Sequence, residues 1–210
     1  MFKNIAIAAF AVTAAFSGMT TAHAENLITN GSFEAPSINP GSYSLYNSIP
    51  GWTLASGSKI EIQNNIVGKA ADGFQFVELD SDASSSIMQT INTTAGKHYQ
   101  LTFAFSARPG TGLSDNILGV NWNGASVSKL TANGSGQGDT HWKTYTYDLV
   151  AHGSTSTVQF SDLGASNSLG TYIDHVSVAA VPEPSTVASF LIGGVALAAL
   201  GLRRRKSVMA

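Results

Sequence analysis

A tryptophan between two asparagines, Asn121-Trp122-Asn123, is the group best suited to contact sugar in this 210-residue sequence. An indole stacks on the apolar C–H face of a sugar ring, and carboxamides exchange hydrogen bonds with its hydroxyls. Gly124 follows, and Asn-Gly between two strand-like runs predicts a tight hairpin with this group at its tip. Arg108, in another loop, is a cation that could join it on an acidic sugar. The alternative is a Trp122 that supports the hairpin from inside the core.

No catalytic arrangement is recognisable in the rest of the chain. There is no cysteine, no His-Glu-x-x-His motif and no Gly-x-Ser-x-Gly turn, so thiol nucleophiles and two common hydrolase signatures are missing. Asp80-x-Asp82 does not begin an EF-hand loop, because Ser85 and Ile91 stand where that loop needs Gly and Glu. These observations favour a protein that is not an enzyme.

Apolar and polar residues alternate through most of residues 25–181, and this period of two predicts strands with one buried face. Residues 35–58 contain three prolines and three glycines and are predicted to be mainly loop. No convincing helical period is present. The expected fold is an all-β jelly-roll β-sandwich of eight or nine strands. These eight or nine strands are expected among ten candidate ranges: 27–33, 59–64, 74–80, 85–92, 98–107, 116–122, 125–130, 141–150, 156–161 and 171–179.

The first 24 residues have the three parts of a secretory signal peptide. Lys3 supplies positive charge, residues 5–16 are a short apolar run, and Ala22-His23-Ala24 fits a cleavage site. The alternative is a transmembrane anchor, which needs about 20 apolar residues, and this run is shorter. We therefore expect cleavage after Ala24 and export through the inner membrane.

Residues 182–210 have three parts in a fixed order. They are Pro182-Glu183-Pro184, a predicted apolar helix over 187–202, and the basic cluster Arg203, Arg204, Arg205 and Lys206. This order resembles the PEP-CTERM sorting signal of Gram-negative bacteria that make extracellular polysaccharide. The resemblance implies processing by an exosortase after transient residence in the inner membrane, and release to the cell surface or extracellular matrix. A simple tail anchor is the alternative.

Residues 25–181 make one domain by length, with enough chain for a hydrophobic core. They carry six Lys and Arg against twelve Asp and Glu, a formal charge of minus six. Nucleic acid binding requires a cationic surface, so no nucleic acid partner is expected.

Four segments of this domain resemble the galactose-binding-domain-like superfamily of jelly rolls. They are NLITNGSFE (26–34), PGW (50–52), GFQFVEL (73–79) and SLGTYIDHVSV (168–178). The superfamily includes many carbohydrate-binding modules and plant cell-wall proteins with a domain of unknown function. The resemblance implies that the opening and closing segments lie side by side.

In such modules these two segments hold a structural calcium ion, which implies that Glu34 and Asp174 are ligands here. Calcium takes six to eight oxygen ligands, and Asp72 is a weaker third candidate. The alternative is that the carboxylates accept hydrogen bonds from backbone N–H groups at strand ends.

Two functions of different kinds remain open. The first is a non-catalytic surface or matrix protein that binds polysaccharide, and the second is a structural matrix protein without a defined ligand. Fold resemblance alone does not choose between them.

Overall fold

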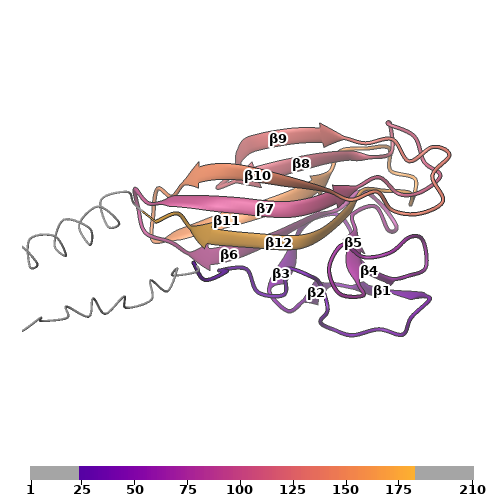
Figure 1. The fold of residues 1–210 in the computed structure, drawn as a ribbon, viewed down its shortest axis with the longest axis horizontal. Coiled ribbons are helices and arrows are strands. Elements are labelled where there is room, and N and C mark those ends of the chain that lie inside the picture. Colours follow the sequence, from indigo (N-terminus) through magenta and orange to yellow (C-terminus); the bar gives the residue numbers. More distant parts are fainter. Residues whose placement is uncertain (1–23, 183–210) are drawn as a thin grey trace, which may run out of the picture.

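The computed structural model describes residues 24–182, which form two antiparallel sheets (Figure 1). The first sheet has the order β1 (Ser42–Tyr46), β4 (Ile60–Asn64), β5 (Phe76–Glu78), β12 (Tyr172–Ala180), β7 (His98–Ser106) and β10 (Lys143–Val150). The second has the order β2 (Ser48–Ile49), β3 (Trp52–Ser56), β6 (Ser86–Asn92), β11 (Thr155–Asp162), β8 (Ile117–Trp122) and β9 (Ala125–Thr131). The described residues contain no helix, and the predicted all-β sandwich is confirmed.

The two sheets meet face to face, and alternate side chains of each strand fill the space between them. On β7, Leu101, Phe103 and Phe105 are buried in the core. The ring of Phe103 meets that of Phe160 on β11 edge to face, with centroids 4.9 Å apart. This contact joins the sheets near their centre, as the period of two predicts.

The predicted hairpin at Asn123-Gly124 is confirmed. It joins β8 to β9, and both turn residues have positive φ, 52° and 78°. Asn and Gly accept this left-handed conformation more readily than other residues.

Two parts of the strand prediction were wrong. Residues 35–58 contain β1, β2 and β3, because their prolines and glycines fall between short strands. Residues 27–33 form turns, since Asn30 and Phe33 both adopt φ of 54°. An extended strand cannot continue through two such residues.

The opening and closing segments of the domain are neighbours, as the resemblance implied (Figure 1). Asn26 forms an isolated bridge with Ala179, and the Leu27 N–H donates to the Val178 carbonyl at 2.8 Å. Residues 1–23 of the predicted signal peptide and the predicted helix 187–202 lie outside the described residues. Within residues 24–182, no helix is long and apolar enough to cross a membrane.

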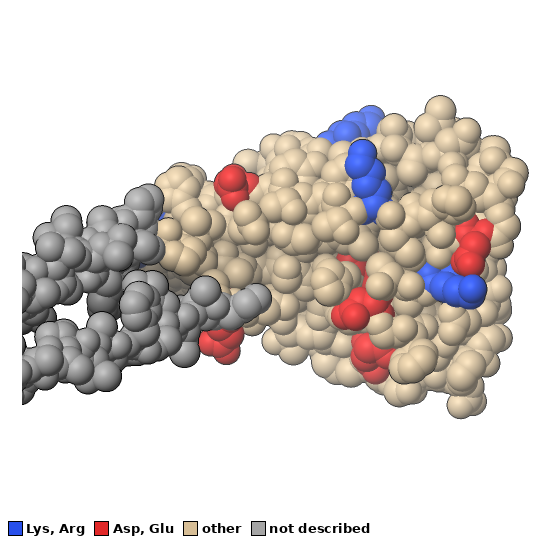
Figure 2. All heavy atoms as spheres, in the orientation of Figure 1, with Lys and Arg blue, Asp and Glu red and all other residues tan. Residues whose placement is uncertain are grey.

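Uncharged side chains cover most of the face drawn in Figure 2, which shows a few Lys and Arg and several Asp and Glu side chains.

Candidate functional site

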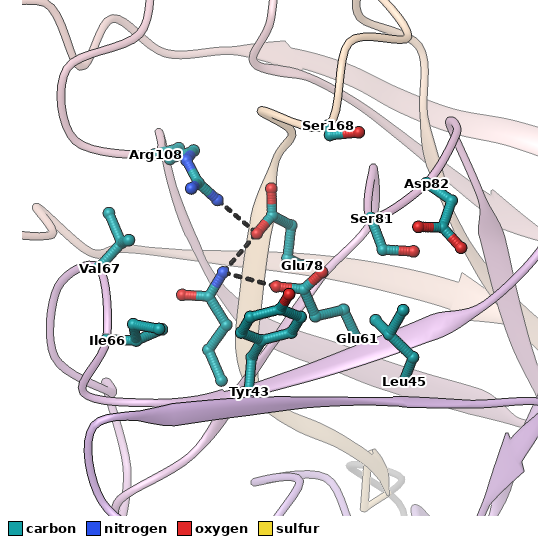
Figure 3. Close-up of a pocket in the computed structure, with 11 residues that line it drawn as sticks. Tyr43, Leu45, Glu61, Ile66, Val67, Glu78, Ser81, Asp82, Arg108 and Ser168 are labelled. Carbon is teal, nitrogen blue, oxygen red and sulfur yellow. Dashed lines mark hydrogen bonds and ion pairs between the residues drawn. The ribbon is translucent and has the colours of Figure 1, made fainter.

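A pocket of about 220 Å³ opens on the outer face of the first sheet (Figure 3). On β4, Ile60 and Ile62 enter the core, so Glu61 and Gln63 point to the opposite face. Strands β1 and β5 flank β4 and add side chains on the same face. Loops from other parts of the chain complete the wall, including the one that carries Arg108.

Two buried glutamates meet in this pocket. Glu61 lies opposite Glu78 in the register of β4 and β5. Gln63 Nε2 donates to Glu61 Oε1 at 2.9 Å and also to Glu78 Oε2. The N–H of Gly170 donates to Glu78 Oε1 at 2.9 Å. Glu78 is therefore held by partners from other elements, and Glu61 by a neighbour on its own strand.

Burial controls the protonation of this pair. It raises the pKa of Glu78 to about 9, with a further increase from the negative charge of Glu61. Burial also raises the pKa of Glu61. Two adjacent carboxyl groups removed from water do not both ionise readily, so the pair retains a proton at neutral pH.

Arg108 fixes the other side of Glu78. Its Nη1 lies 2.5 Å from Glu78 Oε2, and its guanidinium carbon lies 5.9 Å from the centre of the Tyr172 ring. The Arg108 N–H donates to Asn116 Oδ1 at 2.8 Å, which anchors the loop. The predicted binding cation therefore lines the pocket, with its charge already paired.

The rim of the pocket is apolar and open to solvent. Tyr43 is 54% exposed, and Leu45 and Ile66 are also exposed. Exposed rings and aliphatic side chains beside buried polar groups are typical of small-ligand sites.

The prediction that Trp122 stacks on sugar was wrong. Its side chain is only 5% exposed, its ring centroid lies 6.4 Å from that of Tyr99, and its Nε1 donates to the Val150 carbonyl at 3.0 Å. Leu118 and Val120, at alternate positions on β8, are buried in the same core. The indole is therefore a core residue, the alternative considered above.

The predicted neighbours of Trp122 do not form a site with it. Asn123 stabilises the turn, since its Oδ1 accepts the Thr157 N–H at 2.8 Å, and Asn121 is half-buried in β8. Tyr99, which contacts Trp122, is near the start of β7, whereas Arg108 follows its end. Arg108 and Trp122 thus lie at opposite ends of the sandwich.

Glu34 and Asp174 hold the same segment, residues 71–75. Glu34 Oε1 accepts the N–H groups of Phe74 and Gln75 at 2.7 and 2.8 Å. Asp174 Oδ2 accepts those of Ala71 and Asp72 at 2.8 and 2.9 Å. Between these contacts Gly73 has φ of 69°, and a Cβ there would lie 2.4 Å from Glu34 Oε1. The two predicted ligands therefore act as backbone acceptors.

The third predicted calcium ligand, Asp72, also has protein partners. Asp72 Oδ2 is engaged by the Ser32 hydroxyl at 2.5 Å and faces His175 Nδ1 at 3.1 Å. In the part of the chain that the structure describes, no three His, Asp or Glu side chains are grouped to hold a metal. Burial raises the pKa of Asp174 to about 7. Calcium stays a prediction, and thermal melting with and without a chelator tests it.

The family model described as "Protein of unknown function (DUF642)" matches residues 26–179. The chain belongs to the DUF642 family. The PEP-CTERM protein-sorting motif matches residues 180–206 of this DUF642 protein, which agrees with the predicted sorting tail and indicates an exported, cell-surface protein. Of the predicted sorting residues, Pro182 ends the described chain, and Glu183, Pro184 and the arginine cluster lie beyond it.

A curated relative of the DUF642 protein is halomucin of Haloquadratum walsbyi, 28% identical over 184 residues. That alignment covers 83% of this chain and 2% of halomucin. The chain therefore spans a small fraction of that relative.

Several solved structures share the sandwich. An arabinose-bound MgGH51 α-L-arabinofuranosidase is 15% identical, with 74% of this chain and 26% of that chain covered and a TM-score of 0.50. TmCBM61 in complex with β-1,4-galactotriose is 17% identical over 75% of this chain and 99% of its own, with a TM-score of 0.46. The CBM35 of Cellvibrio japonicus Abf62 is 21% identical over 66% and 93%, with a TM-score of 0.45. At these identities the likeness concerns the fold alone.

The sequence prediction missed Glu61, Gln63 and Glu78. Each lies next to apolar residues in a strand, and this pattern predicts a polar side chain on a solvent-exposed face of the sheet. The available signal was the presence of Glu and Gln within short, otherwise apolar strands, Ile60-Glu61-Ile62-Gln63 and Phe76-Val77-Glu78. Only the register of β4 against β5 brings the two glutamates together.

Proposed function

We propose that this DUF642 protein is exported from a Gram-negative cell, processed by an exosortase, and binds polysaccharide at the cell surface or in the matrix. The observation that carries the binding part is the pocket on the first sheet. It combines an exposed aromatic ring, Tyr43, with carboxyl, carboxamide and guanidinium groups that other residues hold in place.

The chemistry of these groups suits a sugar. Carboxyl and carboxamide oxygens accept hydrogen bonds from hydroxyl groups, and Gln63 and Arg108 also supply N–H donors. The Tyr43 ring offers a flat apolar face for C–H groups. Polar groups already held in place lose little conformational freedom on binding, which favours affinity.

The contacts of the two glutamates favour binding over catalysis. A glycosidase uses one carboxyl group as a general acid and the other as a nucleophile or general base. Here both carboxyl groups accept a hydrogen bond from the same nitrogen, Gln63 Nε2, and Glu78 is also paired with Arg108. These contacts support a pocket that binds without catalysis.

Binding assays with the Tyr43→Ala variant test this function. Polysaccharide binding that depends on Tyr43 supports it. A protein that binds no glycan would instead be a structural matrix protein without a defined ligand.

We expect the protein recovered from its producer to end near Pro182-Glu183-Pro184. The match of the PEP-CTERM sorting motif to residues 180–206 supports processing by an exosortase in this segment. Mass spectrometry of the surface fraction should show no peptide containing Arg203, Arg204 or Arg205. An intact C-terminus at Ala210 in that fraction would contradict this part of the proposal.

A further inference from the structure

The pocket carries more negative than positive groups. Its lining contains three carboxyl groups, on Glu61, Glu78 and Asp82, and one cation, Arg108. Arg108 is already paired with Glu78. The three carboxyl groups would carry three negative charges if all were ionised. The proton retained by the glutamate pair and the Arg108 guanidinium each offset one of them, which leaves a net charge of minus one. A uronic acid or a sulfated sugar would add a further negative charge, which the pocket disfavours.

A buried hydroxyl in the same pocket has no partner. Ser81 is 7% exposed and lines the pocket beside Asp82, which is exposed (Figure 3). Among the described residues, Ser81 Oγ is one of two buried side-chain polar atoms without a hydrogen bond; the other is Gln137 Oε1, which does not line the pocket. A hydroxyl left unsatisfied in this way is stabilised by a ligand group that bonds to it.

Asp82 and Glu61 lie near enough to interact. The negative charge of Asp82 contributes to the raised pKa of Glu61. Figure 3 shows Ser81 and Asp82 on the same side of the pocket, with Glu61 between them and the Tyr43 ring. Two carboxyl groups, a hydroxyl and an aromatic ring are groups that together coordinate an ammonium ion, by charge, hydrogen bonding and cation–π attraction.

Building on the proposed function, we propose that the pocket selects a sugar with a free amino group, whose ammonium is bound by Glu61, Asp82 and the Ser81 hydroxyl. The sugar ring lies against Tyr43. Arg108 and Gln63 hold Glu78 in place and do not contact an acidic substituent.

Ammonium binding is coupled to proton release. Its positive charge stabilises the fully ionised glutamate pair, so the proton shared by Glu61 and Glu78 passes to the solvent as the ammonium enters. The covalent bonds of the sugar do not change. N-acetylated and neutral sugars carry no such charge and leave the proton where it is.

Titration calorimetry of the purified protein with three oligosaccharides tests this selection. The probes are glucosamine, N-acetylglucosamine and galacturonate oligomers of equal length. We expect the glucosamine oligomer to bind at least roughly tenfold more tightly than the other two. The binding enthalpy of the glucosamine oligomer, measured in two buffers of different ionisation enthalpy, should differ in the way expected for proton release. The binding enthalpy of the N-acetylated probe should not depend on the buffer.

Variants separate this site from general attraction to an acidic protein. Glu61→Gln should abolish both the preference and the proton release. Asp148→Asn removes one exposed carboxylate on β10 outside the pocket and should change neither.

The outcomes also distinguish this inference from the proposed function. The amino-sugar selection is overturned if N-acetylated or neutral oligomers bind as tightly as the glucosamine oligomer. If Tyr43→Ala weakens that binding, the proposed polysaccharide function still stands. Glucosamine binding that Asp148→Asn weakens as much as Glu61→Gln also overturns the selection. Failure of all three probes and of the producer's own polysaccharide to bind contradicts both.

Discussion

Replacing Trp122 with alanine is expected to lower the free energy of unfolding by about 3–5 kcal/mol, the usual cost of removing a large buried aromatic side chain. The variant loses the contact with the Tyr99 ring and leaves the Val150 carbonyl without its Nε1 donor. Both effects act on the folded state, because the indole is buried in it. Chemical denaturation of the two proteins measures the difference.

Tyr43→Ala is the matched control for this substitution. Tyr43 is also aromatic but is 54% exposed, and we expect its loss to change stability by less than about 1 kcal/mol. If Trp122→Ala is as stable as Tyr43→Ala and binds polysaccharide less well, the sugar-binding role that the sequence predicted for Trp122 would be supported.

Glu78→Gln is expected to reduce the pH dependence of stability. Folding raises the pKa of Glu78 from 4.5 to about 9, so above pH 4.5 the folded protein keeps a proton that the unfolded chain releases. This group therefore makes the folded state progressively less stable as the pH rises from about 4.5 to 9. Glutamine resembles the protonated form and does not titrate. The variant should gain stability relative to the original protein by a few kcal/mol across that range.

Denaturation curves at pH 5, 7 and 9 check this difference. Asp174, whose pKa is also raised, contributes in both proteins and cancels in the comparison. Asp148→Asn should follow the pH dependence of the original protein. Parallel pH profiles for Glu78→Gln and the original protein would show that Glu78 is ionised in the fold across this range.

The sequence predicted most of the fold, because alternation of apolar and polar residues determines which face of a strand is buried. The long strands β7, β10 and β11 show this alternation clearly. The short strand β1 escaped prediction because Ser-Tyr-Ser-Leu-Tyr lies among prolines and glycines. The left-handed conformation of Phe33, with φ of 54°, has no signal in the sequence, because a bulky apolar residue rarely adopts it.

The site was harder to predict because it depends on register. Trp122 could have been placed in the core from Leu118 and Val120, which share its face of β8. The proximity of Glu61 and Glu78 could not be predicted, because neither segment contains a signal for the strand with which it pairs. Arg108 was identified as a site residue, but its pairing with Glu78 is a property of the folded chain.

The affinity of the purified protein for its producer's own extracellular polysaccharide tests the central claim most directly. Tyr43→Ala should weaken binding by roughly tenfold or more, the effect of losing one large stacking contact, with an unchanged melting temperature. Phe74→Ala is the control, because Phe74 is aromatic and 68% exposed but lies outside the pocket lining, and it should bind like the original protein. Undiminished binding by Tyr43→Ala, or equal losses in both variants, would contradict a binding site at this pocket.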